Sequence, residues 1–221
     1  MIWVGQFGIA DGEAREATPW VGVYPASDHD DEGADLYVLV DPALPGSEEF
    51  LAEMKDAIGR VFHESKSSLT GGVLRALRTA NENLRDWNRR SLKEHQVAAG
   101  VSCLAVTENA AYLAQVGPSL AFFFRNGQVE DAVAAIPEAV DPLGLQDEFW
   151  PEFRRYDLYP GDRLLLLSPG LAAKFAGAPL ADALALDGEE ALPELYKLAR
   201  GEQNCGALLV ASTPEVAPAR R

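Results

Sequence analysis

Cysteine and histidine are scarce in this chain, which has two cysteines and three histidines among its 221 residues. Cys103 and Cys205 lie in apolar segments without a Cys-x-x-Cys spacing, so we expect two buried thiols in a cytoplasmic protein. The three histidines have no spacing typical of metal ligands; they are His29, His63 and His95.

Long apolar runs and positive charge are also missing. No segment reaches the roughly 18 to 20 apolar residues of a membrane-spanning helix. The first residues have no basic region of the kind that begins a signal peptide. Only 19 lysines and arginines oppose 34 acidic residues, which gives a net charge of −15. Nucleic acids and anionic membranes repel such a chain. We therefore expect a cytoplasmic protein with no nucleic-acid partner and no membrane partner.

The glycine motifs of nucleotide-binding proteins are absent too, since the sequence has neither a Walker nor a Rossmann pattern. Gly117-Pro118-Ser119 faintly resembles the nucleophile turn of α/β-hydrolases. Apolar residues and Asn126-Gly127 follow it, however, so its context is strand-turn-strand rather than strand-turn-helix. The acidic stretch 27–33 is interpreted as a solvated hairpin loop. A metal cluster there is the alternative, although adjacent side chains rarely converge on one ion.

The sequence does contain a regular succession of strand-like and helix-like segments. Dense β-formers between turn residues predict strands at 2–10, 20–24, 35–41, 101–107, 110–116, 119–124, 128–133 and 206–211, with another strand between 144 and 160. Apolar residues at helical spacing predict a helix pair that starts at Ser47 and Gly72, short helical pieces at 171–175 and 179–185, and a helix at 191–200. This order predicts one α+β domain over 1–211, followed by a frayed tail at 212–221.

The segment GDRLLLLSPGL, residues 161–171, combines a strand signal with an unusual loop. The run from Leu164 to Leu167 predicts a strand that is buried on both faces. Loops at the ends of such strands often carry chemistry. Here the loop is Ser168-Pro169-Gly170, and a proline side chain offers neither a charge nor a metal-binding atom.

Six segments, in order, resemble the metal-dependent PP2C-type protein phosphatases, including their sporulation-E-like branch. They are "LYVLVDPALPG" (36–46), "LRALRTANENL" (74–84), "AAGVSCLAV" (98–106), "AYLAQVGPSLAFFFRNGQVE" (111–130), "YPGDRLLLLSPGL" (159–171) and "EQNCGALLVA" (202–211). The resemblance covers nearly the whole chain. It implies a four-layer α-β-β-α sandwich, in which helices flank a central antiparallel β-sandwich. The alternative is that the prolines simply end strands in an unrelated fold.

The resemblance also implies a hydrolase with two Mg²⁺ or Mn²⁺ ions, which need several carboxylates as ligands. Of the four acids that it assigns to the metals, Asp41 is kept and three are replaced. The three replaced acids are now Trp20, Pro169 and Gln203, and a glycine whose carbonyl helps to bind metal is now Pro42. Arg15, at a phosphate-binding position, and Asn204 are retained. Glu16 and Glu202 lie close to positions where an acid is replaced and could substitute as metal ligands. A side chain one residue further along a strand points to the opposite face, however, so we do not expect this substitution.

On this pattern the 168–170 loop is interpreted as a metal-ligand loop whose acid has become Pro169. We therefore expect a catalytically inactive phosphatase domain that is not an enzyme, with no bound cofactor and a hydrophobic cleft. The expected work is regulatory binding in bacterial-type signalling, either to a protein partner such as a kinase or a phosphopeptide-recognising module, or to itself as a homodimer. The alternatives are a weak Mn²⁺- or Mg²⁺-dependent serine/threonine phosphatase that uses Asp41, and an inert structural or oligomerisation domain.

Overall fold

The computed structural model describes residues 1–15, 18–26, 33–132 and 141–214. Its strands are β1 (Ile2–Ala10), β2 (Glu13–Arg15), β3 (Val21–Tyr24), β4 (Asp35–Pro42), β5 (Ala99–Val106), β6 (Ala110–Val116), β7 (Leu120–Arg125), β8 (Gln128–Asp131), β9 (Glu152–Asp157), β10 (Arg163–Leu167) and β11 (Cys205–Ser212). Its helices are α1 (Glu48–Glu64), α2 (Leu69–Asn88), α3 (Ala178–Ala185) and α4 (Gly188–Ala199), with short 3₁₀ turns η1 (Lys93–His95) and η2 (Pro169–Leu171).

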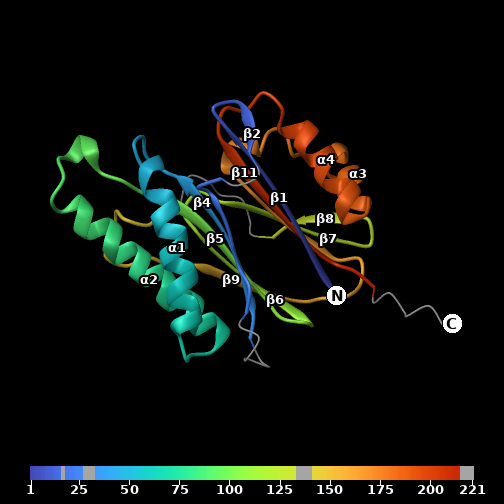
Figure 1. Ribbon diagram of the computed structural model, residues 1–221, viewed down its shortest axis with the longest axis horizontal. Helices are drawn as coiled ribbons and strands as arrows, with labels where there is room; N and C mark the ends of the chain where they lie inside the picture. Colours follow the sequence, from blue (N-terminus) through green and yellow to red (C-terminus); the bar gives the residue numbers. More distant parts are fainter. Residues whose placement is uncertain (16–17, 27–32, 133–140, 215–221) are drawn as a thin grey trace.

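Two antiparallel sheets lie between two pairs of helices (Figure 1). One sheet has the order β2-β1-β11-β10-β7-β8, and the other has the order β3-β4-β5-β6-β9. Helices α1 and α2 pack on the β4–β5 sheet, while α3 and α4 pack on the β1–β11 sheet (Figure 1). The four layers confirm the predicted α-β-β-α sandwich.

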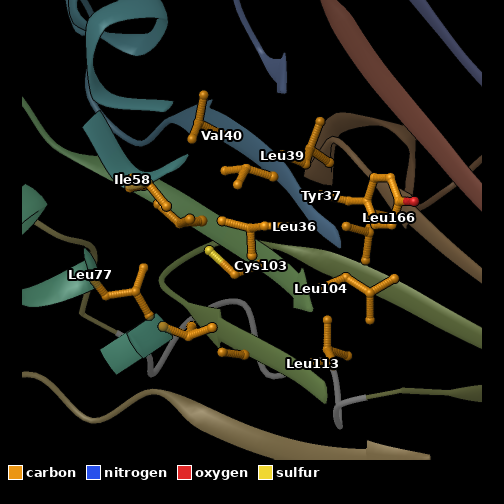
Figure 2. Packing of buried hydrophobic residues seen from close by; sticks show 14 of the residues in the cluster. Leu36, Tyr37, Leu39, Val40, Ile58, Leu77, Cys103, Leu104, Leu113 and Leu166 are labelled. Carbon is orange, nitrogen blue, oxygen red and sulfur yellow. The ribbon is translucent and has the colours of Figure 1, made fainter. Parts of the chain in front are cut away.

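Alternation along the strands builds this layering. On β4, Leu36 and Val40 point toward Ile58 of α1, whereas Tyr37 and Leu39 point toward Leu166 of the other sheet (Figure 2). Because successive strand residues point to opposite faces, a strand with a helix layer on one side and a sheet on the other is apolar along most of its length.

Strand β10 follows the same rule, and its burial on both faces confirms the prediction. Leu164 and Leu166 belong to the core that fills the space between the sheets. Leu165 and Leu167 belong to a second core under α3 and α4. All four side chains are fully buried, which the run of leucines predicted.

The helix pair begins close to where the sequence places it, but Ser47 plays a different part. Its side chain makes no capping hydrogen bond to α1. Instead the buried Ser47 hydroxyl accepts a hydrogen bond from the Ala98 N–H at 3.0 Å, which fastens the start of α1 to the start of β5. Ser68 does cap α2, because its hydroxyl accepts from the Gly71 N–H at 3.3 Å.

Two short segments differ from the sequence-based prediction. Strand β2 was not predicted, because three residues with a single alanine between two charged side chains carry no strand signal. The Asp11-Gly12 turn before it, with both residues at positive φ, is the signal that indicates this hairpin. The helical piece expected at 171–175 is the 3₁₀ turn η2 followed by irregular turns. Residues 27–32 of the acidic stretch and His29 lie outside the described residues, and so do residues 215–221 of the expected tail.

The two cysteines are buried, as predicted. Burial raises the pKa of the Cys103 thiol to about 12, which makes it unreactive. Within the described residues, no helix combines the length and apolar character that crossing a membrane requires.

Asn88 links three parts of the chain through buried hydrogen bonds. Its side-chain N–H groups donate to the Val97 and Gly144 carbonyls at 2.8 Å each, and its oxygen accepts from the Val97 N–H at 2.7 Å. Because Asn88→Ala leaves these backbone groups buried without partners, we expect it to lower the free energy of unfolding by about 2–4 kcal/mol. Urea denaturation followed by circular dichroism measures this loss. The control is Asn83→Ala on the exposed side of α2, which should cost less than about 0.5 kcal/mol; equal losses would contradict the role of Asn88.

Candidate functional site

One end of the sandwich gathers most of the residues singled out in the sequence. Strand β4 ends at Asp41 and Pro42, Ser168 follows β10, and β11 begins next to Gly206. The Ser168 hydroxyl accepts a hydrogen bond from the Gly206 N–H at 2.8 Å and donates one to the Asp41 carboxyl. This chain of hydrogen bonds joins the two sheets at their ends.

Asp41 is a carboxyl group in an apolar setting, with 6% of its surface exposed. Burial raises its pKa to about 7, and the hydrogen bond from Ser168 opposes this shift by favouring the charged form. An acid with a pKa near neutrality can take up or release a proton at physiological pH. Such perturbed groups are more frequent at functional sites than elsewhere.

Trp20 lies beside the C-terminal end of β4. It is buried in the core between the sheets, and its carbonyl accepts the Val40 N–H at 2.9 Å. A Cβ atom on Gly206 would come within 3.4 Å of the Trp20 Cβ atom, so the tryptophan lies against the start of β11. Pro42 and Pro169 are partly exposed on either side, at the end of β4 and at the first position of η2.

Gln203 and Asn204 lie beside the β1–β2 hairpin. The Gln203 carbonyl accepts the Gly12 N–H at 2.9 Å, and the Asn204 side-chain oxygen accepts the Asp11 N–H at 3.1 Å. Both contacts hold the turn of the hairpin against the loop that precedes β11. The retained Asn204 therefore has a structural role here.

The remaining predicted positions are charged and more exposed. Arg15 lies on β2 and pairs with Glu13 at 2.9 Å. Glu202, one of the two acids weighed as a substitute ligand, pairs with Lys174 at 2.6 Å. Glu16, the other one, lies outside the described residues.

The donor set can be compared with the two-metal centre that the family resemblance implies. Within 1–15, 18–26, 33–132 and 141–214, no three His, Cys, Asp or Glu side chains come together in a way that could hold a metal ion. Asp41 brings one carboxyl, and two divalent cations need several anionic oxygens. The described residues therefore do not fit a two-metal centre.

A second polar cluster lies on the inner face of the neighbouring strands. The Gln115 amide donates to the hydroxyls of Ser102 and Ser119, at 3.0 Å each, and Ser102 is completely buried. Ser119 lies between β6 and β7, in the strand-turn-strand context that the sequence predicts, so it is no hydrolase-type nucleophile. Sequence analysis overlooked Gln115, because a polar residue inside an apolar strand gives only a weak signal.

An aromatic groove opens between α2 and the segment 147–153, with a volume of about 450 Å³. Its apolar lining consists of Leu74, Phe149, Trp150, Pro151 and Phe153. The Trp150 side chain is 81% exposed. Arg85 of α2 pairs with Asp147 across the groove. We call this feature the Trp150 groove.

The strand register places the Trp150 groove at the same end of the molecule as Asp41. Leu39 of β4 lies opposite Ser102 of β5, which lies opposite Gln115 of β6, which in turn lies opposite Glu152 of β9. Three strand spacings span about 14 Å. Trp150 precedes β9 at this end, and sequence analysis did not single it out.

Comparison with solved structures gives matches over almost the whole chain. Serine/threonine phosphatase Stp1 from Staphylococcus aureus aligns with a TM-score of 0.77 and 15% identity, over 97% of this chain and 96% of that chain. The Mycobacterium tuberculosis serine/threonine phosphatase PstP/Ppp aligns with a TM-score of 0.73 and 16% identity, over 96% of this chain and 99% of that chain. The chain has the PP2C-type phosphatase fold.

A third PP2C-fold match is PppA, described as a key regulatory component of T6SS in Pseudomonas aeruginosa. It aligns with a TM-score of 0.72 and 18% identity, over 96% of this chain and 97% of that chain. No protein-family model matches the sequence, and no curated protein sequence matches it. Because these solved structures share the fold over almost the whole chain, the alternative that the prolines end strands in an unrelated fold is wrong.

The comparison also corrects the prediction that the chain is not an enzyme. Two of the structures that share its fold over nearly their full length, from Staphylococcus aureus and Mycobacterium tuberculosis, are described as serine/threonine phosphatases. The prediction counted acids at positions that the sequence resemblance alone had assigned, and Glu16 lies outside the described residues. The number of replaced acids is therefore not sufficient to exclude enzymatic activity for a chain with this fold.

The raised pKa of Asp41 makes stability depend on pH. An acid whose pKa rises on folding binds its proton more tightly in the folded state, so its favourable contribution is lost as pH rises from 3.8 to about 7. We expect Asp41→Asn to match the wild type near about pH 4 and to exceed its free energy of unfolding by about 2–4 kcal/mol near about pH 8. Urea denaturation across this range, with EDTA present, measures the difference.

The matched control is Asp182→Asn, an exposed acid on α3, which should leave the pH profile of stability unchanged. An Asp41→Asn protein that is less stable than the wild type at high pH would contradict the burial argument.

Proposed function

We propose that this chain is a regulatory domain of serine/threonine phosphorylation signalling that binds a protein partner. The partner is a component of the same signalling, such as a kinase or a phosphopeptide-recognising module. Two findings support the proposal. The fold is that of serine/threonine phosphatases, and one matched protein, PppA, is described as a regulatory component.

The Trp150 groove is the observation that carries the binding part of the proposal. Tryptophan is enriched among the few residues that supply most of the energy of protein–protein interfaces. An exposed Trp150 beside Phe153 and Pro151 is costly in water unless a partner covers it. Asn81 and Asn88 of α2 hold the preceding segment 144–146 through hydrogen bonds to Gly144 and Gln146, so the chain that leads into the groove is fixed against α2.

Charges of both signs surround these aromatic residues. Arg78 and Arg85 lie on the α2 side, and Asp147 and Glu148 lie on the opposite side. A mixed rim around an apolar centre is the usual composition of a protein-binding surface. It suits a folded protein or a segment of one better than a uniformly charged ligand.

Serine/threonine phosphatase activity is the second candidate function. The phosphatases among the matched structures favour it, and so does Asp41, the one acid kept among the four that the resemblance assigns to metal ligands. A domain can bind a partner through the Trp150 groove and hydrolyse phosphate esters as well. The two functions are therefore measured separately.

Hydrolysis of p-nitrophenyl phosphate with and without millimolar Mn²⁺ tests the second candidate. If the site is catalytic, activity should require Mn²⁺ and fall at least about a hundredfold in Asp41→Asn. Mn²⁺ should also raise the Tm of the wild type but not that of the variant. Asp182→Asn is the control for the loss of one acid. Equal rates in the wild type and in Asp41→Asn would remove the second candidate and leave the binding proposal.

Site-specific crosslinking tests the first candidate. A photoreactive phenylalanine in place of Trp150 should crosslink one protein, and the same residue in place of Leu192 on α4 should not. The captured protein is then purified and titrated against the wild type and Trp150→Ala. We expect Trp150→Ala to raise Kd by at least about tenfold. Unchanged affinity, or capture from both positions, would overturn the proposal.

A further inference from the structure

The outer surface of the helix pair carries a groove distinct from the Trp150 groove. It has a volume of about 430 Å³ and runs between α1 and α2. Its apolar lining consists of Phe50, Met54, Ala57, Ala80, Leu84 and Trp87. The rings of Phe50 and Trp87 meet edge to face, with centroids 4.8 Å apart. We call this feature the α1–α2 groove.

Trp87 departs from what its position in the sequence predicts. It continues the apolar stripe of α2 formed by Val73, Leu77, Ala80 and Leu84, which predicts burial. The other four side chains are buried, but Trp87 is 50% exposed. The apolar stripe of α2 therefore extends past the core and ends at the solvent-exposed surface.

Two opposite charges lie on the α1 side of this groove. Glu53 and Arg60 stand on either side of Ala57, both exposed, seven residues apart. Seven residues are two helical turns, or about 10 Å. Neither side chain takes part in an ion pair within the described part of the chain. The neighbouring Asp56 already accepts from Lys55 and from the Tyr24 hydroxyl, each at 2.8 Å.

This arrangement of charges is complementary to itself. If two α1 helices cross antiparallel close to Ala57, Glu53 of each chain faces Arg60 of the other. A twofold axis makes both contacts at once, as an isologous interface requires. The small side chain of Ala57 allows the two helix axes to approach closely at the crossing.

We propose that the chain forms a twofold-symmetric dimer in which the α1–α2 groove packs against the same groove of a second copy. Ala57 lies at the centre, Phe50 and Trp87 supply apolar contacts on either side of it, and the two Glu53–Arg60 contacts set the antiparallel register. A partner with charge of one sign along this face would be attracted at one rim residue and repelled at the other. Electrostatic complementarity of this kind selects the partner and its orientation more than it adds affinity.

Sedimentation velocity over a range from low micromolar to several hundred micromolar protein tests the dimer. The wild type should shift with concentration from the mass of one chain, 23.9 kDa, to twice that mass. Trp87→Ala should raise Kd at least about tenfold, because it removes an aromatic anchor. A wild type that stays monomeric throughout overturns the proposal.

Charge reversal separates this interface from any other. Glu53→Arg and Arg60→Glu each place like charges opposite one another twice in the dimer, so each should raise Kd at least about tenfold. The double variant with both changes restores the pairs and should return Kd to within about threefold of the wild type. Asp182→Arg on α3, at the far side of the molecule, changes the net charge as Glu53→Arg does and should have no effect (Figure 1).

A dimer that the single reversals leave unchanged, or that the double variant fails to restore, overturns the proposal. The four charge variants alter exposed residues, so a folded state is expected for each and is checked by circular dichroism. Capture at Trp150 reports on the other groove, so either proposal can fail without the other.

Discussion

Burial of β10 and β11 on both faces is the constraint on which the rest of the structure depends. Their inner side chains fill the space between the sheets, and their outer side chains fill the space under α3 and α4. None of the four leucines of β10, Leu164 to Leu167, can be replaced by a polar residue without weakening one of the two cores. Polar groups therefore gather at the ends of these strands, where Ser168 accepts from the Gly206 N–H and hydrogen-bonds to Asp41.

A buried carboxyl at this junction is costly unless its surroundings compensate. Asp41 keeps one hydrogen bond, from Ser168, and burial removes most of the water that would otherwise solvate its charge. Because burial disfavours the charged form, the carboxyl binds its proton more tightly, and its pKa rises to about 7. The hydrogen bond from Ser168 links the end of β10 in one sheet to Asp41 of β4 in the other, so the stability and the chemistry of the site are coupled through the Asp41 side chain.

Sequence patterns predicted the layers well, because apolar periodicity reports which face of an element is buried. The leucine run predicted β10, and the spacing of Phe50 to Phe62 predicted α1. Patterns could not predict contacts between segments distant in sequence. The loop 168–170 was judged by what Pro169 lacks, and the neighbouring Ser168 was missed because its partner, Asp41, is far away along the chain. Trp87 was assigned to the core because periodicity does not show where the neighbouring layer ends.

Strands β1 and β11 pair along their full lengths, from Ile2 opposite Ser212 to Ile9 opposite Cys205. During synthesis, β1 leaves the ribosome long before β11 does. At a rate of synthesis of about 5–20 residues per second, roughly 10–40 s pass before β11, the partner strand of β1, is made. The sheet that contains β4, β5 and β6 can assemble with α1 and α2 in the meantime. The sandwich is therefore expected to close from one layer to the other, and β1 depends on its early neighbours to remain unaggregated until β11 arrives.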